Sequence, residues 1–197
     1  MTLPPARLIS AGMIDDIKFL DDATRPPPVK LEGLTEAQRA GGAHLKEIHD
    51  HLRDNMRVLG TLIERARSGK ASVAEVTAEA SGLAMVANLR RFGNLCGQYC
   101  AMVNVHHSIE DQALFPAIAA QGPAFKAIAD RLVAEHVVVH ELLERLVAAL
   151  GDLAREPDDS HFEDAVTIYR ALEKVLLSHL GYEEDAIGDA LGYFDIL

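Results

Sequence analysis

The 197-residue sequence lacks features on which several classes of protein depend. Two cysteines can form neither a disulfide scaffold nor a four-cysteine zinc or iron–sulfur site. No uncharged apolar run approaches the ~18 residues that a membrane span needs, and the first residues carry no export signal. Nineteen basic residues against 30 acidic ones give a net charge of −11, which argues against a nucleic-acid or anionic-membrane partner. We therefore expect a cytoplasmic protein with reduced thiols.

Prolines are concentrated near the N-terminus. Pro4, Pro5 and Pro26–Pro28 fall within the first 34 residues, and proline disrupts the interior of a helix. We interpret residues 1–34 as an arm or linker that wraps the domain, mediates homo-oligomer assembly, or forms a mobile tail. Residues 35–197 are expected to form the domain.

From Thr35 onward the apolar residues recur with a helical period. Thr35 and Gln38 have the spacing of a capping box, which predicts the start of a helix that ends near Ser68–Gly69. A short helix is expected over about 72–80, and long ones over about 83–119, 124–155 and 160–190, with a break at Gln121–Pro123. No segment alternates like a strand. The predicted fold is all-α, an up-down four-helix bundle with an extended N-terminal arm.

The nine histidines are the most informative residues. At about 100° per residue, the apolar face of every long helix includes a histidine, and two faces also include a glutamate. These inward residues are His49, His106, Glu110, His136, His140, His179 and Glu183. Buried polar groups of this kind persist when they are paired or bound to metal. Five imidazoles and two carboxylates exceed the needs of one tetrahedral zinc. They suit two six-coordinate ions bridged by the carboxylates, with one position open, and are compatible with iron.

Alternatives stay open on the first and fourth helices. His44 and His51 lie together on one flank of the first helix and are candidates to replace or supplement His49. On the fourth helix the direction of the side chains favours Glu183, with Glu184 as the alternative.

On the second helix the same geometry favours His106 and Glu110 over His107 and Asp111. His107 is accordingly expected at the surface or behind the ligands. The spacing does not show which carboxylates accept the second N–H group of each imidazole.

The combined pattern resembles that of the hemerythrin family in its bacterial form, the hemerythrin-like (HHE cation-binding) domain. That family has one histidine on the first helix, His-x-x-x-Glu on the second and His-x-x-x-His on the third. The fourth carries His-x-x-x-Glu or His-x-x-x-x-Asp. The matching segments here are 48–53, 106–110, 135–140 and 179–184, and the resemblance covers about residues 40–190. It implies a non-haem di-iron centre, with two iron ions joined by an oxo or hydroxo bridge. Manganese and zinc stay open as alternatives.

The resemblance implies iron that cycles between ferrous and ferric states and meets O₂, peroxide or nitric oxide. An all-imidazole end of the site holds no acid poised to cleave an O–O bond, which favours reversible binding. The leading hypothesis is therefore a protein that binds O₂ or a related small ligand, as a sensor, carrier or store.

Two tyrosines bear on the alternatives. Tyr99 lies two turns from His106 on the same face, and Tyr182 is beside Glu183. Either phenol is a candidate hydrogen-bond donor or iron ligand, or else a core residue. A phenol at the site would favour a peroxidase or catalase-like enzyme, or a nitric-oxide-consuming one, in oxidative stress defence. Whether the chain is an enzyme stays open. A third alternative is a metal-free helical interaction module, which would bury seven polar residues without a cation.

Overall fold

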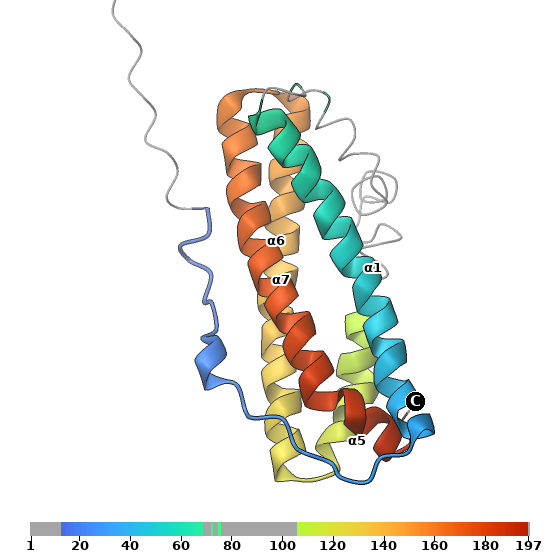
Figure 1. Ribbon diagram of the computed structural model, residues 1–197. Coiled ribbons are helices and arrows are strands. Elements are labelled where there is room, and N and C mark those ends of the chain that lie inside the picture. The colour runs from blue at the N-terminus through green and yellow to red at the C-terminus, as the bar shows by residue number, and fades with distance from the viewer. Residues whose placement is uncertain (1–12, 69–71, 73–74, 76–105, 197) are drawn as a thin grey trace, which may run out of the picture.

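The computed structural model describes residues 13–68, 72, 75 and 106–196, and these residues form helices and no strand. The elements are η1 (Asp22–Thr24), α1 (Glu36–Arg67), the π-helical η2 (Glu110–Leu114), α5 (Phe115–Ala119), α6 (Pro123–Arg155) and α7 (Asp159–Tyr193). The long helices α1, α6 and α7 lie side by side as a bundle, and α7 runs antiparallel to the other two (Figure 1). Among the described helices, none combines the length and hydropathy required to cross a membrane.

Local sequence signals set the helix boundaries. The predicted capping box is present, because the Thr35 hydroxyl accepts a hydrogen bond from the Gln38 backbone N–H and the Gln38 side chain accepts one from the Thr35 N–H. Helix α6 begins after Gly122, whose φ of 146° favours glycine. The Asp158 carboxylate accepts a hydrogen bond from the His161 N–H at 2.8 Å and so begins α7.

The second predicted long helix, 83–119, is described only from His106 onward. Its described part is helical at residues 106–109, passes through the π turn η2 and continues as α5. Most of the short helix expected over 72–80 lies outside the described residues. The full up-down order of four helices therefore stays a prediction.

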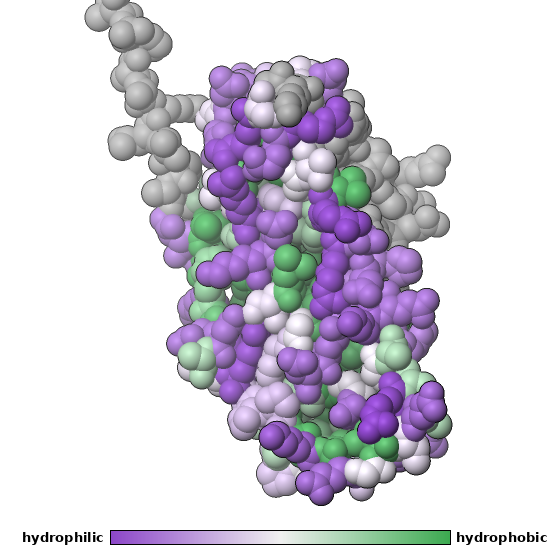
Figure 2. Space-filling model, viewed as in Figure 1, coloured by the Kyte–Doolittle hydropathy of each residue, from purple (hydrophilic) through white to green (hydrophobic). Residues whose placement is uncertain are grey.

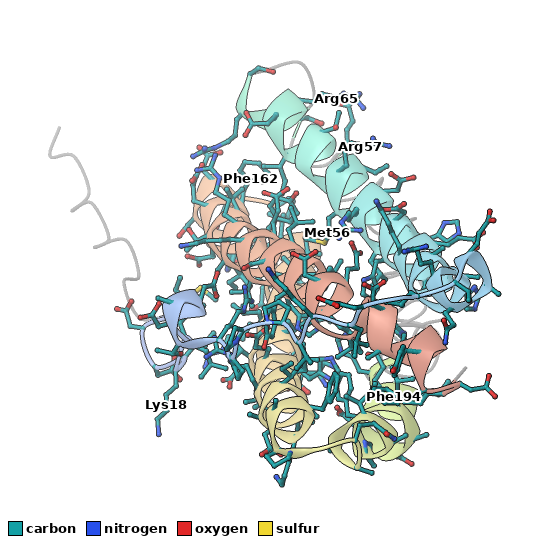
Figure 3. The ribbon with its side chains drawn as sticks, turned by 60° about the horizontal axis from the view of Figure 1, so that its bottom comes forward. Lys18, Met56, Arg57, Arg65, Phe162 and Phe194 are labelled. Carbon is teal, nitrogen blue, oxygen red and sulfur yellow. The ribbon has the colours of Figure 1, made fainter. Side chains whose placement is uncertain are left out.

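The core has two apolar clusters separated by a polar layer. On α1, His49 lies between Leu45 of one cluster and Leu52 of the other, and α6 and α7 repeat this order. Figure 3 shows Met56 pointing into the space between helices and Arg57 pointing outward, and the outer surface in Figure 2 is mostly hydrophilic. The buried residues of the polar layer are His49, His107, Glu110, Glu135, His136, His179 and Glu183.

Residues 13–34 lie against the bundle. This segment follows α6 and α7 and then passes the lower end of the molecule to reach α1 (Figure 1). The Ile17 side chain is buried in the core, and the Asp16 carboxylate pairs with the Arg145 guanidinium of α6 at 2.7 Å. A role of the arm in assembly and the domain boundary at residue 34 stay predictions.

Candidate metal centre

The polar layer brings imidazole nitrogens and carboxylate oxygens from four helical segments together. They form three overlapping groups, in each of which one potential donor atom per residue lies within 4.8 Å of the others. The groups are His49 with His106 and Glu110, His107 with His136 and His179, and Glu110 with His136 and Glu183. Because Glu110 and His136 each belong to two of the groups, the donors form one continuous site rather than separate ones.

Carboxylates fix the orientation of three imidazoles through the Nδ1 atom. These pairs are His49 with Glu184 at 2.9 Å, His136 with Asp111 at 2.9 Å, and His179 with Glu135 at 3.1 Å. Each carboxylate follows or precedes a donor residue in the sequence, yet it holds a histidine on a neighbouring helix. A hydrogen bond at Nδ1 sets the tautomer and aims Nε2 at the centre, which is the usual arrangement behind metal-binding histidines.

Seven buried nitrogen and oxygen atoms of the polar layer have no hydrogen-bond partner among the described residues. They are Nε2 of His107, His136 and His179 and both carboxylate oxygens of Glu110 and Glu183. The imidazole nitrogens and carboxylate oxygens of the layer approach one another at 3.0 to 3.6 Å. A buried polar atom without a partner costs about 1–3 kcal/mol, so this convergence is unfavourable unless a cation is shared. The residues present therefore fit a metal site.

Burial shifts the pKa values of these groups strongly. Burial raises the pKa of Glu110, and the neighbouring Glu183 carboxylate raises it further. Burial also acts to raise the pKa of Glu183, but the imidazoles of His179, His49 and His136 together keep that pKa below its usual range. Burial lowers the pKa of His106 to about 4 and lowers that of His107 as well. Both imidazoles are thus neutral near pH 7, which is the form that binds metal.

The Glu135 carboxylate is charged although it is buried. Burial acts to raise its pKa, but hydrogen bonds from His179, Arg25 and Arg131 lower it to about 2. Burial acts to lower the pKa of His179, and the facing carboxylates of Glu135 and Glu183 raise it to about 9. Cation binding at His179 Nε2 would therefore release a proton near pH 7.

Six of the seven residues that the sequence placed inward fall in these groups. They are His49, His106, Glu110, His136, His179 and Glu183. The seventh, His140, is half-buried and lies outside the groups, with its Nε2 2.6 Å from Nδ1 of His107. Its role as a ligand stays a prediction.

His107 is 1% exposed rather than at the surface, and its ring stacks on that of His136 at 3.8 Å between centroids. Two neighbouring residues about 100° apart can both face the interior when their helix lies between two others. His106 faces α1, where its Nε2 is 3.2 Å from Nε2 of His49, and His107 faces α6. A sequence prediction that assumes one inward face per helix therefore does not find this second inward direction.

The alternative metal ligands that the sequence suggested lie at the surface or behind the donor residues. His44 and His51 are exposed, away from the donor groups. The Glu184 carboxylate binds Nδ1 of His49 and the Arg53 guanidinium, the latter at 2.7 Å. Glu184 thus holds an imidazole that belongs to the layer, whereas Glu183 supplies unpartnered oxygens to its centre.

The structure describes only one of the two candidate tyrosines, Tyr182. The Tyr182 hydroxyl donates a hydrogen bond to the Pro26 carbonyl oxygen at 2.9 Å and so contacts the arm. Burial raises the pKa of this phenol to about 12. Tyr99 lies outside the described residues.

Comparison with known proteins finds one family whose model covers the whole polar layer. The model of the hemerythrin HHE cation-binding domain matches residues 41–191. This range includes every donor residue described above and begins after the arm. No curated protein and no solved structure matches the chain.

Proposed function

Because the chain belongs to the hemerythrin HHE cation-binding domain family, we propose that its polar layer holds two iron ions and that the protein binds O₂ or a related small ligand there. The seven buried donor atoms without hydrogen-bond partners carry this proposal. Imidazole and carboxylate donors together suit iron. The carboxylates behind three of the imidazoles give further support, because they orient nitrogen atoms for a metal.

The proposed ligands follow the donor groups. His49, His106 and Glu110 would hold one ion, and His107, His136 and His179 would hold the other, with Glu183 as a further carboxylate beside Glu110 and His136. This set differs at one position from the family pattern, which has His140 in place of His107. Because Nδ1 of His107 lies 2.6 Å from Nε2 of His140, both rings would lie near the same ion.

Iron in this layer would supply a centre that changes between ferrous and ferric states and has affinity for O₂, peroxide and nitric oxide. The chain itself excludes water, because His49, His179 and Glu183 are 0% exposed and an apolar cluster lies on either side. The carboxylates at Nδ1 hold the imidazole rings in place during any change of charge at the centre. A small ligand would thus meet the site in a dry and rigid environment.

Iron content and the visible spectrum test the proposal. We expect about two iron ions per chain after anaerobic loading with Fe²⁺ and near-ultraviolet bands of a ferric pair after exposure to air. His49→Ala should lose iron, whereas His44→Ala on the same helix should retain it, because His44 is exposed. An intact helical protein that binds no iron would overturn the proposal and favour a metal-free interaction module.

The same sample separates binding from turnover. A spectrum that changes with O₂ and returns when O₂ is removed is the result expected of a binding protein. Continuous consumption of peroxide or nitric oxide would instead assign an enzyme of oxidative or nitrosative stress defence.

A further inference from the structure

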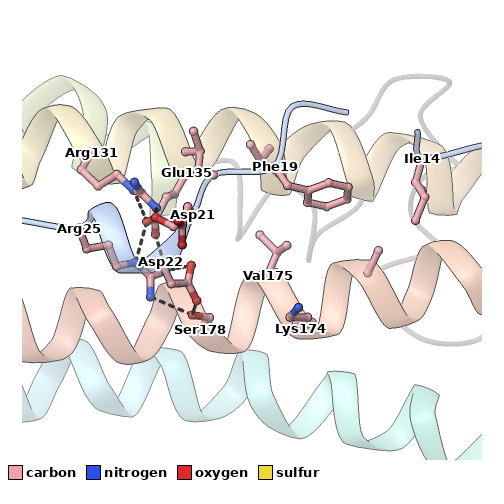
Figure 4. Close-up of a pocket in the computed structure, with 13 residues that line it drawn as sticks. Ile14, Phe19, Asp21, Asp22, Arg25, Arg131, Glu135, Lys174, Val175 and Ser178 are labelled. Carbon is pink, nitrogen blue, oxygen red and sulfur yellow. Dashed lines mark hydrogen bonds and ion pairs between the residues drawn. The ribbon is translucent and has the colours of Figure 1, made fainter. Parts of the chain in front are cut away.

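A six-residue segment of the arm contacts the bundle beside the metal centre. We call residues 21–26 the docking turn; it contains η1. Arg25 donates hydrogen bonds from Nε and Nη2 to the two oxygens of Glu135, at 2.8 and 3.0 Å, and from Nη1 to the Ser178 hydroxyl at 2.8 Å. Figure 4 shows Arg25 of the arm and Arg131 of α6 converging on Glu135. The arm therefore reaches a buried carboxylate of the bundle.

Other contacts hold the docking turn at the same place. Arg131 bonds to Glu135 at 2.6 Å and to the Thr24 hydroxyl at 2.7 Å, and the Ser178 hydroxyl donates to the Asp22 carboxylate at 2.6 Å. Ser178 directly precedes His179 in α7. These contacts therefore involve Glu135, which holds the His179 imidazole, the Arg131 that bonds to Glu135, or Ser178 beside His179.

The Glu135 carboxylate links the arm to the metal centre. Its Oε2 atom accepts from both Arg25 Nη2 and His179 Nδ1. Its exposure is 3%, so water cannot easily replace a missing partner. Without Arg25, Oε2 would retain only the imidazole and Oε1 only the Arg131 guanidinium, so the carboxylate would be held less firmly. The direction of His179 Nε2 thus depends on a residue of the arm.

Between Ile17, which is buried in the core, and the docking turn, the arm leaves the Phe19 and Leu20 side chains exposed. A cavity of about 520 Å³ lies between the arm and helices α6 and α7. Phe19 of the arm and Val175 of α7 line one end of it, and the docking turn lines the other end (Figure 4). A segment with few packed contacts opens locally at low free energy. The polar contacts of the docking turn therefore decide whether this part of the arm is bound.

We propose that Arg25 is a positioning residue of the metal centre, which couples docking of the arm to cation binding through Glu135 and His179. The inference rests on the proposed function. Arg25 lies outside the range that the family model matches, 41–191. Because coupling between two binding events is reciprocal, the cation should stabilise the docked arm by the same factor by which the arm strengthens cation binding.

Fe²⁺ affinity, measured anaerobically by competition with a chromophoric chelator, tests the positioning role. Arg25→Ala should weaken Fe²⁺ binding about tenfold, the lower end of the effect of residues behind metal ligands. Arg25→Lys should lie between, because an ammonium group cannot reproduce the two-pronged contact. Asp16→Ala is the matched control: it removes an arm contact with Arg145 away from the centre and should leave the affinity unchanged. Equal affinities in the Arg25→Ala and Asp16→Ala proteins would overturn the proposal.

Cleavage by a lysine-specific protease tests the reciprocal effect. Lys18 and Lys30 are exposed and flank the docking turn, and Lys126 on α6 serves as a reference for global unfolding. Saturating Fe²⁺ should slow cleavage at Lys18 and Lys30 about tenfold in the wild-type protein, and much less in Arg25→Ala. Wild-type protein that binds Fe²⁺ but is cleaved at an unchanged rate would overturn the coupling and leave the proposed function standing. Wild-type protein that binds no Fe²⁺ would overturn both.

Discussion

Helices α1 and α7 approach closely at two glycines near the metal centre, and this crossing gives a sharp prediction. A methyl group at Gly42 of α1 would lie 2.9 Å from the carbonyl oxygen of Gly188 and 3.0 Å from its carbonyl carbon. A methyl group at Gly188 of α7 would meet only the Cα atom of Gly42, at an ordinary 3.6 Å. The same crossing therefore tolerates a side chain from one helix and excludes it from the other.

We expect Gly42→Ala to lower the stability and Gly188→Ala to raise it. Forcing the backbones apart costs about 1–3 kcal/mol, while alanine is about 1 kcal/mol better than glycine within a helix. Gly42→Ala should therefore lose about 1 kcal/mol net, or roughly 2–4 °C in Tm for a chain of this size. Gly188→Ala should gain about 0.5–1 kcal/mol, because the propensity gain meets no clash.

Thermal unfolding followed by circular dichroism at 222 nm of the iron-free proteins measures both changes. Iron content should also fall in Gly42→Ala, because His49 of α1 must keep its register with Glu183 of α7. Gly192→Ala should be worse still, since its methyl group would overlap the Gln38 carbonyl oxygen. A Gly42→Ala protein as stable as Gly188→Ala would refute the reasoning.

Three further predictions concern the site and the helix ends. His107→Ala should reduce iron content more than His140→Ala, because His107 belongs to a donor group and His140 contacts it from outside; the reverse order would restore the assignment made from the sequence. Asp158→Ala should lower the Tm by roughly 3 °C through loss of a helix cap. The His161 N–H holds the pKa of Asp158 below its usual value, so the wild-type advantage should be present at neutral pH and disappear as the pH falls through that lowered pKa. Free Fe²⁺ at one hundred times its Kd should stabilise the fold by about 2.7 kcal/mol, and chelation should remove this gain in unfolding experiments.

The carboxylates that hold imidazoles could have been identified as candidates from the sequence, but the histidine that each one holds could not. Asp111, Glu135 and Glu184 each adjoin a residue that the helical pattern already placed inward. Each of them holds a histidine of another helix, for example Glu135 of α6 with His179 of α7. Adjacency in the sequence marks such residues as candidates, but only the packing of the helices decides which ring each one reaches.

Features that depend on local periodicity and helix capping can be predicted from the amino-acid sequence. The helix starts near Thr35 and Asp158, the break before Pro123 and the inward direction of most donors follow from interactions within a few residues. The burial of His107 and the contact of Arg25 with Glu135 follow from the packing of the elements and are not predictable from the sequence. Both depend on which elements lie side by side across more than a hundred residues of chain or around a helix with two inward faces. Rotation along one helix carries no information about the positions of its neighbours.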